Sequence, residues 1–313
     1  MRVRTTFPKM SLVIIMLVLA CDQLSAAPQV ESGYRCKRSP SFLGEYGFSP
    51  SNSAFTTSLR KQIGLFLIEA RTTPGKERQV YQHPTWRMGG YLGALTFSEQ
   101  GEIFVLPAPH VNLQDNPPAK SNIVYRVDPK KVAMEQWKVL PSPEGGKEES
   151  TFGAMGITYS CFSDSLYVSS VFGSTRTREV GVVYHLNAKT GEVLGKLNGF
   201  DGFGLASLKV SGRPFLLLGS ARSSDLFGVV LDESGKFLTP PNRLLSLTGL
   251  GPRGDDRIKK IVVNEDSGVL EITGYAFHFN LMNPVEEQKS LYRFKLREID
   301  RNGLLKWEFL GEG

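Results

Sequence analysis

The feature that most constrains the fold is a series of short apolar or alternating segments, separated by Gly, Pro, Asn and Asp. Segments of about four to eight residues with this pattern are typical of β-strands, and long helical periodicity is absent. Four successive segments form one unit, and this unit recurs along the chain. The equivalent glycines Gly93, Gly153 and Gly204 lie 60 and then 51 residues apart. We therefore expect an all-β chain built from repeated four-stranded units.

Four such units are visible in the sequence, and a fifth fits upstream of them. Residues 41–86 are long enough for the fifth unit, with strands expected at 63–69 and 78–81. The strands expected in the four visible units are 93–97, 102–106, 122–127 and 137–140; then 153–159, 165–170, 181–186 and 192–197; then 204–210, 215–218, 226–231 and 236–238; and finally 258–263, 269–273, 291–296 and 304–309.

Repeated four-stranded units predict a β-propeller, in which each blade covers the apolar face of its neighbour. Five blades are our prediction for residues 41–313. Six blades would result if residues 41–86 or a long loop contain further strands, or if an N-terminal strand completes the last blade. Two separate β-sandwiches are the competing architecture.

The third strand of two units ends in the same way. Tyr125-Arg126-Val127-Asp128 and Tyr184-His185-Leu186-Asn187 both follow the pattern Tyr, any residue, hydrophobic, Asp or Asn. This ending resembles blades of the lactonase-like and NHL-type propellers. The resemblance implies the propeller architecture for most of residues 41–313. The metal-binding glutamate and asparagines of lactonase-like propellers have no counterpart here by motif.

The N-terminus has the composition of an export signal. Residues 1–20 contain Arg2, Arg4 and Lys9, no acidic residue, and an apolar run from 12 to 20. Val18-Leu19-Ala20-Cys21 resembles the lipobox of bacterial lipoproteins, which implies lipidation of Cys21. Ordinary cleavage within residues 24–27 is the alternative. We expect a signal peptide at 1–20, a tether at 21–40 and a single propeller domain at 41–313.

The residue after the lipidated cysteine bears on location. Asp22 follows Cys21, and in the bacterial lipoproteins that this segment resembles an aspartate there keeps the protein on the inner membrane. We therefore expect a lipid anchor on the periplasmic face of the inner membrane. Secretion or an outer-membrane location are the alternatives.

The overall charge does not indicate nucleic-acid binding. The chain has 37 Lys and Arg against 31 Asp and Glu, a net charge of +6. Residues 1–20 hold three of those cations, so 34 against 31 leaves +3 after their removal. The remaining basic residues are scattered, whereas a nucleic-acid surface requires a basic cluster. We expect no nucleic-acid partner, and we expect a monomer.

Two of the three cysteines are candidates for a disulfide. If Cys21 carries lipid, Cys36 and Cys161 form an even pair in an oxidising compartment. Their bond would tie the N-terminal segment to the body of the domain. Two unpaired cysteines, with Cys161 packed at the end of a strand, are the alternative.

Candidate binding residues fall in one class of loops. In a propeller, the loops between strands two and three and between successive blades emerge on one face, which we call the loop face. Long loops on a rigid scaffold commonly carry binding sites. The candidates on this face are His83, Trp86, His110, Asn112, Asp115, Asp201, Asp255, Phe277 and His278.

The sequence favours a binding module over an enzyme. It contains no Gly-x-Ser-x-Gly elbow and no phosphate-binding P-loop. We therefore expect a protein from the cell envelope or a small ligand to bind at the loop face, with no cofactor required. A metal-dependent hydrolase of the lactonase or phosphodiester type is the alternative. It would hold a divalent metal with His83, His110 and His278, although no HxH or HExxH spacing is present.

Overall fold

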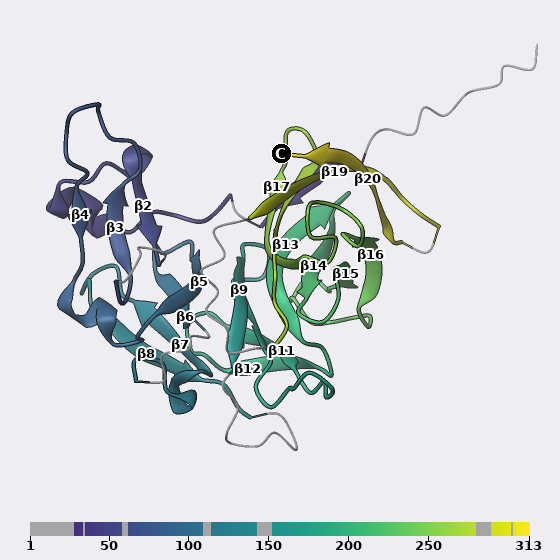
Figure 1. Cartoon of the computed structure of the whole chain (residues 1–313), viewed down its shortest axis with the longest axis horizontal. Helices are drawn as coiled ribbons and strands as arrows, with labels where there is room; N and C mark the ends of the chain where they lie inside the picture. The colour runs from purple at the N-terminus through teal and green to yellow at the C-terminus, as the bar shows by residue number, and fades with distance from the viewer. Residues whose placement is uncertain are drawn as a thin grey trace, which may run out of the picture.

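The computed structural model describes residues 28–33, 35–57, 62–108, 114–142, 152–279, 289–301 and 303–313. Five antiparallel sheets follow one another along this part of the chain, and together they form a five-bladed β-propeller (Figure 1). The prediction of an all-β, five-bladed fold is confirmed. No helix among the described residues has the length and apolar character needed to cross a membrane.

Blade 1 is a sheet of three strands, and blade 2 has four. Blade 1 contains β2 (Ser53–Thr56), β3 (Phe66–Glu69) and β4 (Val80–Tyr81). Blade 2 contains β5 (Leu92–Phe97), β6 (Ile103–Pro107), β7 (Ile123–Val127) and β8 (Met134–Val139).

The other three blades hold the remaining strands. Blade 3 contains β9 (Ala154–Ser160), β10 (Ser165–Ser170), β11 (Val182–Asn187) and β12 (Val193–Asn198). Blade 4 contains β13 (Gly202–Val210), β14 (Arg213–Ser220), β15 (Asp225–Val230) and β16 (Asn242–Ser246). Blade 5 contains β17 (Arg257–Asn264), β18 (Val269–Tyr275), β19 (Ser290–Ile299) and β20 (Leu305–Glu312).

The last strand of blade 4 lies later in the chain than predicted. Residues 236–238 follow a tight turn and form only one isolated bridge, between Leu231 and Phe237. Pro240 and Pro241 come next, and proline has no N–H to donate to a β-ladder. The chain therefore pairs with β15 only from Asn242 onward, as β16.

Apolar cores lie between neighbouring blades. The cluster between blades 1 and 2 includes Leu67 and Ile103. The cluster between blades 2 and 3 includes Phe104 and Val168. Further clusters join blade 3 to blade 4 and blade 4 to blade 5. Burial of apolar side chains between sheets is the main force that holds such blades together.

The N-terminal segment crosses the face opposite the loop face. We call residues 28–33 and 35–43 the strap, and the face with the turns between first and second strands the hairpin face. Within the strap, β1 (Val30–Ser32) pairs antiparallel with β13, so that Val30 lies opposite Val210. From there the segment runs across to blade 1 (Figure 1). This part of the expected tether is therefore an ordered element of the propeller.

The strap contacts the other blades in turn. The backbone N and the Oγ of Ser32 donate to Glu265 of blade 5 over 2.6 and 2.5 Å. Lys37 Nζ donates to Thr96 Oγ1 of blade 2 over 2.9 Å. In blade 1, Phe42 and Leu43 are buried in the core that they share with blade 2. The strap thus bridges the hairpin ends of blades that are far apart in sequence.

A disulfide fixes the middle of the strap to blade 3. Cys36 and Cys161 are bonded, with their Cα atoms 5.7 Å apart and a sequence separation of 125 positions. Cys161 lies in the turn between β9 and β10. Closing so long a loop restricts the unfolded chain strongly, so this bond stabilises the folded state.

Candidate functional site

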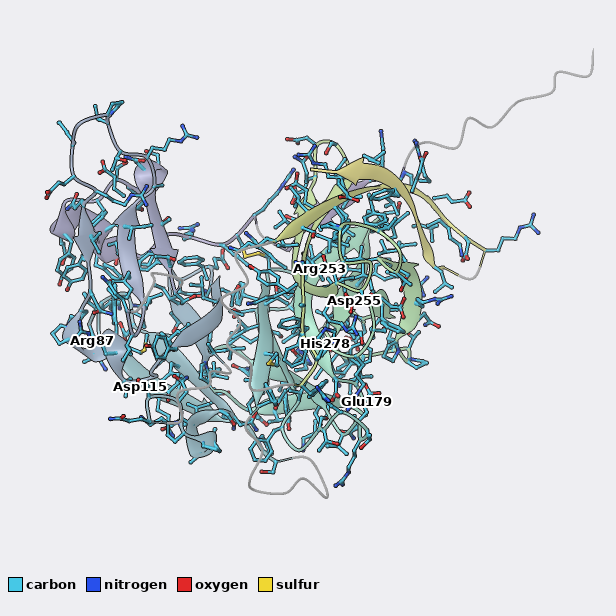
Figure 2. The ribbon with its side chains drawn as sticks, in the orientation of Figure 1. Arg87, Asp115, Glu179, Arg253, Asp255 and His278 are labelled. Carbon is cyan, nitrogen blue, oxygen red and sulfur yellow. A yellow bond between two sulfur atoms is a disulfide. The ribbon has the colours of Figure 1, made fainter. Side chains whose placement is uncertain are left out.

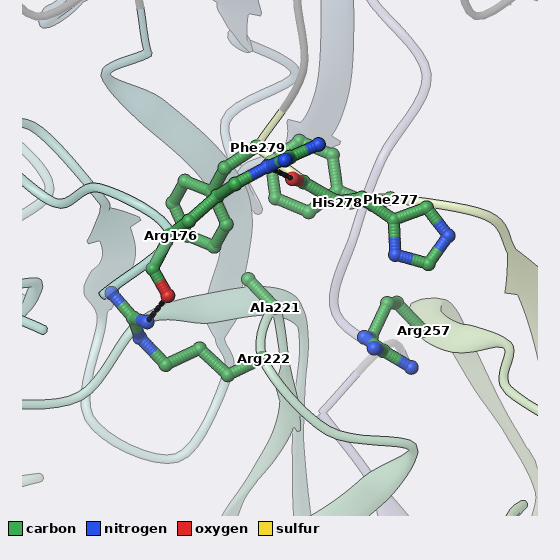
Figure 3. A pocket seen from close by; sticks show the side chains of 7 residues that line it. All are labelled: Arg176, Ala221, Arg222, Arg257, Phe277, His278 and Phe279. Atoms are coloured by element: carbon green, nitrogen blue, oxygen red, sulfur yellow. Dashed lines mark hydrogen bonds between the residues drawn. The ribbon is translucent and has the colours of Figure 1, made fainter. Parts of the chain in front are cut away.

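A hollow of about 430 Å³ opens on the loop face where blades 3, 4 and 5 meet. We call it the mouth hollow. Arg176 comes from the loop between β10 and β11, Ala221 and Arg222 follow β14, and Arg257 begins β17. The segment after β18 supplies the remaining side chains. Figure 3 shows all seven lining residues: Arg176, Ala221, Arg222, Arg257, Phe277, His278 and Phe279.

Arg222 is held rigidly at one side of the mouth hollow. Its Nε donates to Asp201 Oδ2 over 2.5 Å, and its Nη2 donates to the carbonyl oxygen of Thr175 over 2.7 Å. Its guanidinium also donates to the carbonyl oxygens of Arg176, over 3.2 Å, and Arg178. These bonds fix the loop between β10 and β11 of blade 3 against the residues that follow β14 of blade 4.

Two aspartates occupy the same place in successive blades, immediately before the first strand. Asp201 precedes β13 and binds Arg222; Asp256 precedes β17 and binds Arg253. Both aspartates are fully buried. Burial raises the pKa of Asp201. Burial also acts to raise the pKa of Asp256, but hydrogen bonds from Arg253 and Tyr292 outweigh it and lower that pKa.

Arg257 lacks such a carboxylate partner. Its Nη1 donates to Ser224 Oγ over 3.1 Å and to the carbonyl oxygen of Asp255. Its Nε is buried and has no hydrogen-bond partner among the described residues. Within the same part of the chain, no carboxylate oxygen forms an ion pair with it. Arg257 therefore brings a half-buried, uncompensated positive charge to the mouth hollow.

Aromatic rings line the mouth hollow next to the arginines. Phe277 and Phe279 pack edge-on against Phe152, with ring centroids 5.6 and 5.8 Å apart. Phe277 also lies 5.2 Å from the ring of Phe203 on β13. The guanidinium of Arg222 lies 5.0 Å from the centroid of Phe279. The segment after β18 is thus packed over the inner strands and presents ring faces beside the arginines.

A second hollow, of about 640 Å³, lies between blades 1 and 2, and we call it the side hollow. Arg87, Lys120 and Asp115 bring charges of both signs to it. Its other lining residues are Gln62, Ile63, Met88, Gly90 and Gln114. The mixed charge and the lack of an aromatic ring distinguish it from the mouth hollow.

Several predicted site residues do gather at the mouth hollow. Phe277 and His278 line it, and Asp255 lies at its edge, with Oδ2 3.7 Å from His278 Nε2. Asp115 lies away from this group, in the side hollow. Figure 2 shows the separation: Asp115 and Arg87 lie on the side of blades 1 and 2, and His278 and Asp255 on the side of blades 4 and 5.

Other predicted site residues have structural roles. Trp86 is fully buried in the core shared by blades 1 and 2, and its Nε1 donates to the carbonyl oxygen of Val132 over 2.7 Å. Asp201 is enclosed by its bonds to Arg222, Ser174 and Gly181. Because both side chains are shielded from solvent, we remove them from the candidate set.

Of the three histidines proposed as metal ligands, the structure describes His83 and His278, and these two lie in different blades. His83 caps the short helix Pro84–Arg87 in blade 1, where its Nδ1 lies 2.9 Å from Thr85 Oγ1, whereas His278 belongs to blade 5. His110, Asn112 and Cys21 lie outside the described residues. Within those residues, no group of three or more His, Cys, Asp or Glu side chains has the arrangement of a metal site.

Comparison with known proteins gives no family. No protein-family model matches the chain, and no curated protein sequence matches it. Among solved structures, it is similar to Kuenenia stuttgartiensis hydrazine synthase, with 14% identity over 83% of this chain and 63% of that one, and a TM-score of 0.48. It is also similar to a Bacteroides fragilis protein provisionally named a 6-phosphogluconolactonase, with 11% identity over 80% and 64% and a TM-score of 0.46. The chain spans less than two thirds of either protein, and we base no functional argument on these similarities.

The arginines of the mouth hollow were not among the predicted site residues. Arg176, Arg222 and Arg257 are spread over 82 positions of sequence, and each stands in a loop or at a strand start where a solvated arginine is ordinary. The repeat does contain a signal: Asp201 and Asp256 occupy equivalent positions, and each has an arginine partner.

Proposed function

We propose that this chain is a lipid-anchored binding module of the cell envelope, which holds a small ligand in the mouth hollow. The observation that carries the proposal is the mouth hollow itself, where guanidinium groups face aromatic rings (Figure 3). A concave site with apolar walls and a few fixed polar groups is the usual form of a ligand site.

The side chains of the mouth hollow are already positioned. Arg222 is fixed by Asp201 and by backbone carbonyl groups, and Arg257 by Ser224. Phe277 and Phe279 are fixed by Phe152. Because little conformational freedom remains to be lost on binding, more of the interaction energy contributes to affinity.

The chemistry of the lining favours binding over catalysis. The guanidinium groups of Arg176, Arg222 and Arg257 are hydrogen-bond donors only and cannot act as a general base. Among the seven lining residues, His278 is the one able to act as a general base.

Hydrolysis remains the second candidate because of one contact. His278 Nε2 lies 3.7 Å from Asp255 Oδ2, and a carboxylate beside an imidazole can orient it as a base. This candidate predicts turnover of a lactone, ester or phosphodiester, with or without added divalent cations, that is lost in His278→Ala. Panels of these substrates that show no turnover would reject it.

Anchoring through Cys21 would set the orientation of the propeller on the membrane. The carbonyl oxygen of Gln29 accepts a hydrogen bond of 2.8 Å from Ser211 N, which lies in the turn between β13 and β14 on the hairpin face. Seven peptide units join Cys21 to Pro28, a reach of at most about 25 Å. The hairpin face would then lie near the bilayer, and the mouth hollow would face away from it.

Two measurements test the proposal separately. Mass spectrometry of the mature protein should find a lipidated N-terminal Cys21, with processing blocked by globomycin; a mature N-terminus beyond Cys21 would reject the anchor. Ligand-observed NMR with a panel of small polar and aromatic molecules should find binders that weaken in Phe277→Leu. The matched control is Met88→Leu in the side hollow, which should leave binding unchanged. Binding that follows Met88 instead, or no binding, would reject the mouth hollow as the site.

A further inference from the structure

We infer that the mouth hollow recognises a small organic anion, a carboxylate joined to an aromatic or similarly apolar group. This inference rests on the proposed function, because it assumes that the mouth hollow is a ligand site, and it adds the chemical class of the ligand.

The charge of the lining is one-sided. Three of the seven lining residues are arginines, one is a histidine and none is acidic. The charge of Arg222 is compensated by Asp201 and, at 3.6 Å, by Glu179. Arg257 has no such compensation within the described residues. Since holding a guanidinium partly out of water without a counter-ion is costly, an anion placed beside Arg257 would offset that cost.

The guanidinium of Arg257 is positioned to meet a ligand. Its Nη1 is held by Ser224 Oγ and by the carbonyl oxygen of Asp255. Figure 3 shows the group projecting toward the hollow on the same side as the imidazole of His278. A planar guanidinium held in place matches the geometry of a carboxylate, and hydrogen bonds between charged groups are about twice as strong as neutral ones.

The shape of the hollow provides for an apolar group next to the anion. Phe277, Phe279 and the methyl group of Ala221 supply the apolar part of the lining (Figure 3). A volume of about 430 Å³ falls at the small end of the range for ligand pockets. A flat ring stacked on phenylalanine, with its carboxylate directed at Arg257, satisfies both sides of the site.

Benzoate and benzamide provide the test, because they have the same size and ring but differ in charge. Titration of the whole protein, followed by NMR, should give a dissociation constant for benzoate about tenfold lower than for benzamide. Arg257→Gln should bring the two constants to within about twofold, whereas Arg257→Lys should keep part of the preference. Phe277→Leu should weaken both ligands equally. Thermal unfolding of each variant shows whether it is folded.

The control is Arg87→Gln in the side hollow, which should leave the preference for benzoate unchanged. Equal binding of benzamide and benzoate to the unchanged protein would overturn the inference while leaving the proposed binding site in place. Failure of both ligands to bind at millimolar concentration would overturn the inference and the small-ligand site together. Inorganic phosphate that binds as tightly as benzoate would reject the apolar part of the site.

Discussion

Two carboxylates in equivalent loops between blades, Asp201 and Asp255, have opposite roles. Asp201 is fully buried and joins blades 3 and 4 through Arg222, whereas the side chain of Asp255 is 53% exposed and lies near His278. The sequence places both in loops and offers no way to distinguish them, because burial depends on contacts between blades. Phe277 and His278 were found from the sequence since their segment is visibly a long loop with aromatic residues.

Removal of the Asp201 carboxylate should destabilise the protein strongly. Asp201→Ala leaves Arg222 and the Ser174 hydroxyl without their buried acceptor, which should lower the free energy of unfolding by about 3 kcal/mol. The matched substitution Asp255→Ala should change it by less than about 0.5 kcal/mol. Urea denaturation compares the two variants. Similar losses in both would contradict the assigned roles.

His185 should make stability depend on pH. It is 1% exposed on β11 and stacks on Tyr167, and burial lowers its pKa from 6.5 to about 4. Between these values the unfolded chain binds a proton that the folded protein does not, so stability rises with pH across this window. His185→Phe removes this contribution. We therefore compare the free energy of unfolding of the variant with that of the original protein. This difference should favour the variant by about 2–3 kcal/mol more at pH 4.5 than at pH 7.5.

Chemical denaturation at the two pH values measures this difference. Many carboxyl groups also titrate between them, but they are common to both proteins and cancel in the comparison. Free energies of unfolding that run parallel for the two proteins from pH 4.5 to 7.5 would contradict the assignment.

At the scale of elements, local sequence determines most of the strands. Nearly all expected strands form, because alternating apolar residues and turn residues are local signals. One departure is blade 1, which has three strands instead of four. Two others have identifiable causes. Pro240 and Pro241 displace the last strand of blade 4, and β1 forms because it pairs with β13, which is remote in sequence. The pairing partner of a short polar strand cannot be predicted from its own residues.

The glycines that revealed the repeat differ in how closely other backbone atoms approach them. A Cβ on Gly153 would lie 2.1 Å from the carbonyl oxygen of Ser121, whereas on Gly93 its nearest neighbours would be at 3.5 Å. Gly153→Ala should therefore cost about 1–3 kcal/mol of stability, and Gly93→Ala should be tolerated. Thermal unfolding of the pair decides the matter, and equal effects would contradict the close approach.

At the scale of the whole molecule, the strap joins blades that share no sequence neighbourhood. It pairs with blade 4, binds Glu265 of blade 5 and is bonded covalently to Cys161 of blade 3. The two cysteines that remain if Cys21 carries lipid made the disulfide conceivable from the sequence, but the course of the strap depends on the assembled ring. If Cys21 is lipidated, this same segment connects the propeller to the membrane.

Loss of the disulfide should weaken the whole domain. Replacing both Cys36 and Cys161 with serine should lower the free energy of unfolding by about 2–4 kcal/mol, because the unfolded chain regains the freedom of a long loop. Reductant should lower the unfolding midpoint of the original protein and leave that of the double variant unchanged. Free thiols on both cysteines in non-reducing peptide mapping would contradict the bond.

In the proposed binding site, Arg257 meets an anion in the mouth hollow. The most direct measurement is a crystal structure of the protein soaked with benzoate. We expect a carboxylate within hydrogen-bond distance of the Arg257 guanidinium and a ring against Phe277 and Phe279. Benzoate found instead beside Arg87 and Lys120 in the side hollow, or absent from the mouth hollow, would contradict it.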